Sequence, residues 1–320
     1  MRFFLGIDGG QSHTAALVAD ESGRILGRGG AGPSNHTREP GGRERLIEAV
    51  TRSAGGALSE AGICVRRLSD FRFLSAHLAL TGEPADKIEI VREILQADHL
   101  EVAHDAPAAL AGALAGEPGV IVLAGTGSVA CGRAIDGRFV RVGGHGYLFD
   151  DRGSAFAIAR DALSAALSDR DRGLSGELAT ELTAFFDRPD IGAIAQDVYA
   201  GVISRDALAG FAARVGSLAE AGSEQARIII YRAADDLAQL AVTVAGRLDD
   251  PQAELRVSYG GGVFRSALLM ERFRALVEAA VPGARIVPPR FGPDVGALLL
   301  AFKLAGRTIT PELFGYILQS

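Results

Sequence analysis

Lysine is nearly absent from this chain. The sequence contains 33 lysines and arginines together, but only Lys87 and Lys303 are lysines, and neither lies in a glycine-rich loop. P-loop NTPases and protein kinases both place a lysine on the phosphates of the nucleotide. The sequence therefore argues against both of these classes.

Cysteine is also scarce, and long apolar or basic runs are missing. Cys64 and Cys131 form neither a disulfide framework nor a metal-binding spacing, so a reducing, cytoplasmic compartment is expected. The apolar run before Asp8 is too short for a signal peptide, and no stretch approaches the ~20 apolar residues of a membrane span. No tract of five or more basic residues appears, so we expect neither a nucleic-acid nor a membrane partner.

The size and composition predict a two-domain globular protein. A chain of 320 residues exceeds what one hydrophobic core usually spans, and its 48% hydrophobic and 22% charged residues are typical of globular proteins. The net charge of −6 does not prevent phosphate binding, because backbone N–H groups and a metal ion can bind phosphates locally.

An internal repeat is the most informative pattern. Residues 3–27 read as strand, glycine-rich turn, strand, acidic-Gly-Arg turn and strand, and residues 120–142 repeat this layout. Gly10 aligns with Gly127, and Gly23 with Gly137. The simplest interpretation is duplication of a whole domain core.

The remaining periodicities place strands and helices after each copy. Strands are expected at 73–80, 100–103, 256–259 and 284–287, and helices at 44–61, 86–96, 107–115, 154–167, 177–186, 191–199, 206–215, 223–248, 265–280 and 294–304. This order predicts α/β domains with mixed sheets and crossover helices. Glycines and a proline at 112–119 suggest domains 1–115 and 116–299, with the last helix, about 300–320, packing back onto the first domain.

The first glycine-rich turn begins at Asp8. A hairpin turn is its plainest interpretation, because Asp-Gly is the commonest hairpin signal. In the functional interpretation Gly9 and Gly10 bring backbone N–H groups to phosphates, Ser12 adds a hydroxyl, and Asp8 holds a hydrated Mg²⁺.

The second turn contains Gly125, Thr126 and Gly127. With Ala130 it also matches a dinucleotide-binding fingerprint, but that motif requires a following helix, and here a second hairpin follows. The duplication favours two equivalent turns that grip phosphates from both sides of a cleft, as in actin-like ATPases.

Three glycines at 260–262 connect a strand to a helix that carries Arg265. A connection from a strand to a helix favours glycine even where no ligand binds. Three in succession exceed what a turn needs, which also allows close backbone contact with a flat ligand such as adenosine.

Asp105 follows a strand and precedes a helix. By itself it reads as a helix N-cap. It also lies at the carboxyl end of a strand, where ligands of open α/β sheets bind, and a carboxylate there can accept the proton of an attacking hydroxyl. Asp150 and Asp151 are either solvated helix-start carboxylates or ligands of sugar hydroxyls, and Asn35, beside His36, is either a turn residue or a partner of vicinal hydroxyls.

Together these segments resemble the BadF/BadG/BcrA/BcrD ATPase family, and within it the N-acetylglucosamine kinase branch. The resemblance spans nearly the whole chain. Its motifs are Gly6-Ile7-Asp8-Gly9-Gly10, Pro33-Ser34-Asn35-His36, Asp105-Ala106-Pro107-Ala108, Gly125-Thr126-Gly127-Ser128, Gly143-Gly144-His145-Gly146, Asp151-Arg152-Gly153-Ser154, Gly260-Gly261-Gly262-Val263 and Pro293-Asp294-Val295-Gly296-Ala297.

The resemblance implies a duplicated, actin-like (ribonuclease H-like) fold, ATP and Mg²⁺ as cofactors, an amino sugar as substrate, and a homodimer. It makes Asp105 the base that activates the 6-hydroxyl. The expected nucleotide and metal residues are Asp8, Gly9, Gly10, Ser12, Thr14, Gly125, Thr126, Gly127, Gly261, Gly262 and Arg265. The expected sugar residues are Asn35, His36, Asp105, Ser128, Gly144, His145, Gly146 and Asp151.

Two departures from the family pattern fall on the sugar side. His145 stands where the family often has tryptophan, and this chain has no tryptophan at all. Asp151-Arg152 stands where the family often has Asp-Glu. Arg152 could meet a carboxylate, so an acidic sugar such as N-acetylmuramic acid is a second hypothesis. Glucosamine, N-acetylglucosamine, N-acetylmannosamine and muramic derivatives all fit the motifs.

Two other functional classes compete with a kinase. One is an ATPase activator that drives electron transfer to a CoA-ester dehydratase or reductase, which needs cysteines for an iron–sulfur cluster. The other is a sugar sensor that has lost catalysis. Asp8, Asp105 and both glycine-rich turns are present, which argues against loss of catalysis.

Overall fold

The structure is a computed structural model that describes residues 2–35, 37–249 and 254–309. The chain divides into two compact units, the first formed by Met1–Glu117 with Pro289–Ser320 and the second by Pro118–Pro288. No helix among the described residues is long and apolar enough to cross a membrane.

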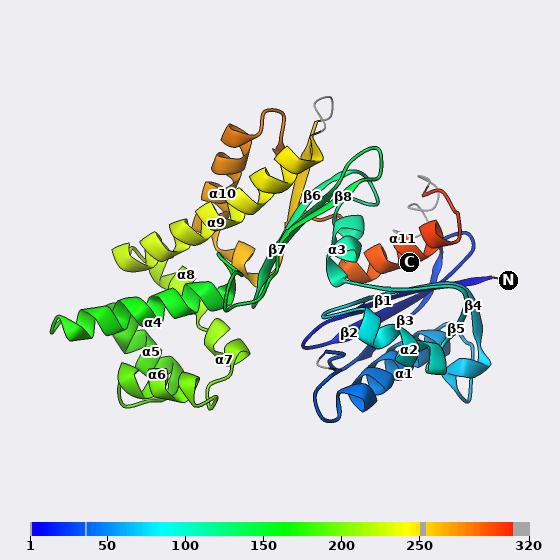
Figure 1. Cartoon of the computed structure of the whole chain (residues 1–320), viewed down its shortest axis with the longest axis horizontal. Coiled ribbons are helices and arrows are strands. Elements are labelled where there is room, and N and C mark those ends of the chain that lie inside the picture. The colour runs from blue at the N-terminus through cyan, green and yellow to red at the C-terminus, as the bar shows by residue number, and fades with distance from the viewer. Residues whose placement is uncertain (1, 36, 250–253, 310–320) are drawn as a thin grey trace. The chain divides into compact units, whose positions relative to one another are not determined.

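The first unit contains a five-stranded mixed sheet in the order β3-β2-β1-β4-β5 (Figure 1). Strand β1 pairs antiparallel with β2 and parallel with β4. The elements are β1 (Phe3–Gly9), β2 (Thr14–Asp20), β3 (Ile25–Ala31), α1 (Gly42–Glu60), η1 (Leu68–Asp70), β4 (Arg72–Leu80), α2 (Ala85–Ile94), β5 (Gln96–Ala103), α3 (Asp105–Ala113) and α11 (Pro293–Leu304).

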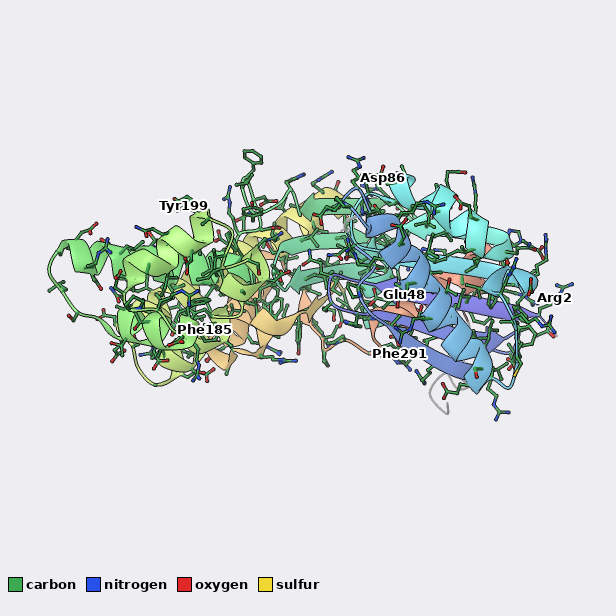
Figure 2. The ribbon with its side chains drawn as sticks, turned by 90° about the horizontal axis from the view of Figure 1, so that it is seen from below. Arg2, Glu48, Asp86, Phe185, Tyr199 and Phe291 are labelled. Carbon is green, nitrogen blue, oxygen red and sulfur yellow. The ribbon has the colours of Figure 1, made fainter. Side chains whose placement is uncertain are left out.

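Alternating side chains of β1 bury both faces of this sheet. Leu5 and Ile7 pack with α1, whereas Phe4 stacks on Phe302 of α11 with ring centroids 4.0 Å apart. Helix α1 lies close to β3 because that strand presents glycine: a Cβ on Gly29 would come within 1.9 Å of a carbonyl oxygen of α1. Figure 2 shows α1 running along the unit, with the exposed Glu48 on its outer side.

The second unit repeats the same plan. Its sheet has the order β10-β9-β6-β7-β8, with β6 antiparallel to β7 and parallel to β9. A helical insertion follows β8. The elements are β6 (Gly119–Ala124), β7 (Ser128–Arg133), β8 (Phe139–Gly143), α4 (Ala155–Asp171), α5 (Glu177–Phe186), α6 (Ile191–Tyr199), α7 (Arg205–Ala209), α8 (Ala212–Glu220), α9 (Glu224–Leu248), β9 (Arg256–Gly260), η2 (Gly262–Arg265), α10 (Ala267–Ala280) and β10 (Arg285–Ile286).

The duplication predicted from the repeat is confirmed by these two sheets, which share strand order and directions. Several element limits differ from the prediction. The helix expected at 206–215 is two helices, α7 and α8, because the chain breaks at Gly210 and Phe211. The helix expected to reach residue 96 ends at Ile94, and Gln96 already begins β5. The helix expected from 265 starts at Ala267, where the Ser266 hydroxyl accepts from the Leu269 N–H.

The limits of the compact units differ slightly from the predicted domains. The first limit falls after Glu117, and the second after Pro288 rather than at 299. The second shift arises because α11 packs against β1 and α3 and so belongs with the first unit. The expected helix at about 300–320 extends into residues 310–320, which lie outside the described part of the chain.

Candidate active site

Three carboxylates gather in the first unit. Asp8 ends β1, Asp105 begins α3, and Asp294 lies in the first turn of α11. Burial, followed by the negative charges of Asp105 and Asp294, raises the pKa of Asp8 to about 7. We call the place where these three carboxylates lie the acidic corner.

The acidic corner suits a hydrated divalent cation. Among the described residues, no group of three or more histidine, cysteine, aspartate or glutamate side chains is placed to coordinate a metal directly. Mg²⁺ usually keeps several waters and uses only one or two carboxylates together with substrate phosphates. Asp8 fits this mode, because a cation held there would relieve the repulsion that raises its pKa.

The first glycine-rich turn is closed by its own backbone. The Gly10 N–H donates to the His13 carbonyl at 2.9 Å, and the Gly10 carbonyl accepts from the Ser34 N–H. A Cβ on Gly9 would come within 2.4 Å of the Ser34 hydroxyl, so this position requires glycine. The Thr14 hydroxyl donates to the Gly32 carbonyl at 2.8 Å. The side chains of Gln11, Ser12 and His13 in this turn are exposed, and the Ser12 hydroxyl lies within hydrogen-bond distance, 3.3 Å, of His13 Nδ1.

The predicted sugar residues of the first unit follow this turn. Asn35 is buried, and its carbonyl accepts from the Arg45 guanidinium at 3.2 Å. His36 lies outside the described residues.

Asp105 is the first helical residue of α3, and the N-cap of that helix is His104. The N-cap interpretation of Asp105 is therefore wrong, and its carboxylate is not used to cap the helix. Instead its Oδ2 accepts a hydrogen bond from the Thr81 hydroxyl at 2.8 Å. Thr81 had no motif to single it out in the sequence.

The second glycine-rich turn lies over Asp151. The Gly125 N–H donates to the Gly127 carbonyl at 2.9 Å, which closes this turn as the first is closed. The Ser128 N–H donates to Asp151 Oδ1 at 3.1 Å, and a Cβ on Gly127 would lie 2.9 Å from both carboxylate oxygens. Gly127 is thus required by close contact with a carboxylate.

Arg205 holds the other oxygen of Asp151. Its guanidinium donates to Asp151 Oδ2 at 2.8 Å and lies over the rings of Tyr147 and Phe156. Asp151 adopts a left-handed backbone with φ 57° and is buried. Both of its oxygens therefore bind protein groups in this structure. Arg205 was missed because it lies far along the chain, in an insertion without a motif.

A cavity of about 490 Å³ opens beside the second turn. Along α7 and α8 its walls combine small side chains with the carboxylates of Asp206 and Glu220, and Ile230 of α9 adds an apolar side chain. Four predicted nucleotide residues line it, namely Gly125, Thr126, Gly262 and Arg265. A partly apolar cavity next to a glycine-rich turn suits an adenosine whose phosphates continue towards that turn.

Gly261 precedes Gly262, which lines this cavity. It has φ 98°, and a Cβ there would come within 2.2 Å of the Ala124 carbonyl oxygen. The requirement for glycine at 261 therefore comes from backbone packing against the second turn. The neighbouring Gly262 faces the cavity.

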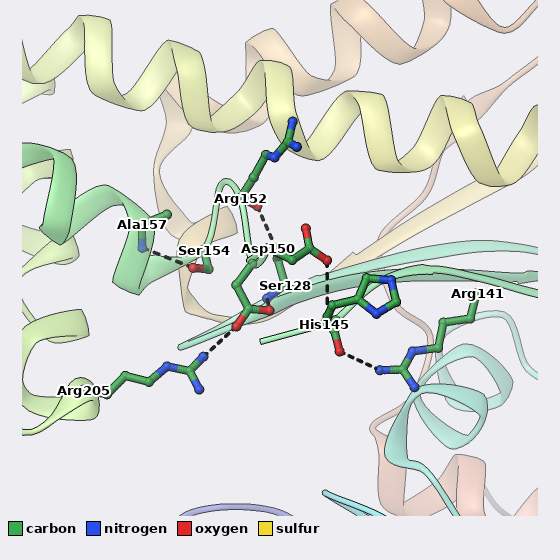
Figure 3. Close-up of polar contacts among 10 residues, drawn as sticks. Ser128, Arg141, His145, Asp150, Arg152, Ser154, Ala157 and Arg205 are labelled. Atoms are coloured by element: carbon green, nitrogen blue, oxygen red, sulfur yellow. Dashed lines mark hydrogen bonds and ion pairs between the residues drawn. The ribbon is translucent and has the colours of Figure 1, made fainter. Parts of the chain in front are cut away.

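The loop predicted to meet the sugar is held by local bonds. The His145 N–H donates to Asp150 Oδ2 at 3.2 Å, and the Gly144 carbonyl accepts from Arg141 at 3.0 Å (Figure 3). The Gly146 carbonyl accepts from the N–H of Asp150 at 2.8 Å. The side chain of His145 is exposed.

Arg152 lies in a smaller cavity of about 250 Å³ that also contains Asp150, Asp161 and Asp236. Burial raises the pKa of Asp236, and the positive charge of Arg152 opposes that rise. The charge of Arg152 therefore already has carboxylate neighbours within the protein.

The two matching five-stranded sheets, each with a glycine-rich hairpin, define the actin-like ATPase fold. The model of the BadF/BadG/BcrA/BcrD ATPase family matches residues 5–301. The chain belongs to this family.

Two relatives cover almost the whole chain. An N-acetylmuramic acid/N-acetylglucosamine kinase of Clostridium acetobutylicum is 27% identical over 303 residues, which are 94% of this chain and 98% of the relative. An N-acetyl-D-glucosamine kinase of Dictyostelium discoideum is 25% identical over 328 aligned positions, again 94% of this chain and 98% of the relative.

Solved structures agree with the fold. A Chromobacterium violaceum protein, provisionally named an N-acetylglucosamine kinase, is 26% identical with a TM-score of 0.77 and covers 94% of this chain and 99% of its own. A glucokinase of the ROK family from Streptomyces griseus, at 20% identity and a TM-score of 0.55, covers 94% of this chain and 99% of its own and shares the fold.

Proposed function

We propose that this protein transfers the γ-phosphoryl group of ATP to the 6-hydroxyl of an amino sugar of the N-acetylglucosamine or glucosamine type. The observation that carries the proposal is the environment of Asp105, which is oriented by Thr81 at the end of the sheet and shares its corner with Asp8 and Asp294. The chain is a sugar kinase, and its relatives from Clostridium and Dictyostelium are named as kinases of N-acetylated amino sugars.

Asp105 acts as general base in this proposal. Its carboxylate accepts the proton of the 6-hydroxyl as that oxygen attacks the γ-phosphorus, and ADP leaves. Asp8 would hold Mg²⁺, which neutralises charge on the phosphates. The adenosine occupies the cavity beside Gly125 and Gly262, and Ser12 and Thr126 contact the phosphates.

The alternatives gain less support. Acceptance of N-acetylmuramic acid through Arg152 would require this arginine to meet a substrate carboxylate, yet Asp161 and Asp236 share its cavity. The electron-transfer activator would need thiolates at a surface between subunits, and Cys131 is buried in β7.

Asp105→Asn tests the base directly. We expect sugar-dependent ADP release to fall by about 10²- to 10⁴-fold, because the amide cannot accept the proton. ATP binding, measured by calorimetry, should persist. Asp98→Asn is the matched control, because Asp98 is an exposed acid on β5 paired with Arg72. Turnover of the Asp105→Asn variant at the control's level would exclude Asp105 as base.

The position of transfer is tested with the 6-deoxy analogue of the best sugar. It should inhibit competitively and release no ADP, since it lacks the attacking oxygen. A phosphorylated 6-deoxy product would place the transfer at another hydroxyl.

A further inference from the structure

Lys87, one of the two lysines of the chain, is buried in the first unit. Its side chain is 1% exposed, and its ammonium donates to the backbone carbonyl of Thr81. Its sequence neighbour Asp86, labelled in Figure 2, instead forms a surface ion pair with Arg38. A buried ammonium is costly unless it is hydrogen-bonded and near opposite charge. A negative charge near Lys87 must therefore offset the cost of burying its ammonium.

The compensating charge comes chiefly from Asp105. Burial lowers the pKa of Lys87, and Asp105 is the largest of the negative charges that oppose this, ahead of Asp86 and Glu83. The chain between Thr81 and Lys87 turns at Gly82, with φ 94°, and a Cβ there would lie 3.3 Å from the Lys87 ammonium nitrogen. The ammonium therefore sits in a tight pocket that the backbone of this turn forms.

Thr81 links Lys87 to the candidate base. Its N–H donates to the Gly9 carbonyl at 2.9 Å, its carbonyl accepts from Lys87, and its hydroxyl donates to Asp105 Oδ2 at 2.8 Å. All three polar groups of Thr81 are thereby used. Within the described part of the chain, no hydrogen bond engages Asp105 Oδ1, which leaves that oxygen for a substrate hydroxyl.

We propose that Thr81 and Lys87 are positioning residues for phosphoryl transfer. Thr81 fixes one carboxylate oxygen of Asp105 so that the other points to the acceptor hydroxyl, and Lys87 fixes Thr81. This inference rests on the proposed function, in which Asp105 is the base. Its physical basis is that a displacement of about 1 Å in a reacting group costs up to about 10²-fold in rate.

Thr81→Val removes the hydroxyl and keeps the shape of the side chain. We expect kcat to fall by about 10- to 100-fold, because Asp105 loses its orientation. The KM for ATP should stay within about twofold, since the nucleotide cavity lies in another part of the chain. Thr81→Ser keeps the hydroxyl and should retain most of the activity. Thr180→Val, which removes an exposed hydroxyl in α5, is the matched control.

Lys87→Met provides a second, independent variant. Methionine fills the buried space without the ammonium, so kcat should fall in the same direction as in Thr81→Val. Because both residues act through one carboxylate, the double variant should lose less than the product of the two single losses. Glu89→Gln in the same helix, an exposed acid paired with Arg92, is its control and should leave kcat unchanged.

A folded Thr81→Val protein with wild-type kcat would overturn the inference, as would independent, multiplicative losses in the double variant. If Thr81→Val does not fold, the kcat of Lys87→Met is compared with that of Thr81→Ser. A wild-type kcat in Lys87→Met then overturns the inference. Full activity of Asp105→Asn would overturn the base and the positioning roles together. An inactive Asp105→Asn beside a fully active Thr81→Val would leave the proposed function standing and reject this inference alone.

Discussion

At the scale of single residues, Asp8 and His77 make stability depend on pH in opposite ways. The pKa of Asp8 is raised to about 7 by burial and by Asp105 and Asp294. The native state then binds this proton more tightly than the unfolded state, so stability falls as pH rises from about 4 to 7. Burial lowers the pKa of His77 to about 4, so stability from this group is lost as pH falls from about 6.5 to 4.

Asp8→Asn separates these two effects. We expect the free energy of unfolding to become higher than that of the wild type above pH 7, by roughly 1.4 kcal/mol for each unit of pKa shift removed, and the difference to vanish near pH 4. Mg²⁺ with an ATP analogue should raise the melting temperature of the wild type more than that of the variant. Asp98→Asn is the control, and a variant whose pH profile parallels the wild type would contradict the assignment.

The sequence singled out some residues of the candidate site and not others, for a physical reason. Asp8 and Asp105 end or follow strands, and local patterns reveal such positions. Thr81 contacts Asp105, 24 residues further along the chain, and Arg205 contacts Asp151 across 54 residues. No local pattern encodes such contacts, so a threonine after a strand or an arginine in a helical insertion carries no signal alone.

At the scale of elements, α3 and α11 approach each other through glycines. A Cβ on Gly296 would come within 1.8 Å of the Ala108 carbonyl oxygen, and one on Gly112 within 2.2 Å of the Gly292 carbonyl oxygen. Both helices begin with site carboxylates, Asp105 and Asp294. The close packing therefore sets where these two acids lie.

Gly296→Ala tests this contact. We expect it to lower the free energy of unfolding by about 3 kcal/mol or more, because the added methyl group overlaps backbone that cannot rotate away. Gly55→Ala is the matched control in α1, where a Cβ meets nothing within 4 Å. It should raise stability by about 0.5 to 1 kcal/mol through helix propensity. Equal effects of the two substitutions in urea unfolding would contradict the packing account.

Elements were predicted well where turns and periodicity agree. Strand β1 ends in Asp-Gly, the turns from β2 to β3 and from β7 to β8 contain Ser-Gly and Asp-Gly, the turn from β6 to β7 contains Gly-Thr-Gly, and the strand order follows from the repeat. The helical insertion was predicted less well, since Gly210 divides α7 from α8 within an otherwise helical pattern. Helix α11 lies with the first unit through packing that a local pattern does not reveal.

At the scale of the whole molecule, duplication distributes the chemistry over two units. The first unit contributes the carboxylates Asp8, Asp105 and Asp294, and the second contributes the cavity beside Gly125 and Gly262. The homodimer implied by the family resemblance stays a prediction.

The most direct test of the central claim is ADP release from MgATP by the wild-type protein across a panel of hexoses and amino sugars. We predict that ADP release depends on the sugar and is fastest with an amino sugar, either N-acetylglucosamine or glucosamine, and that glucose is a poorer substrate. ADP release at the same rate with and without every sugar would contradict the assignment as an amino sugar kinase.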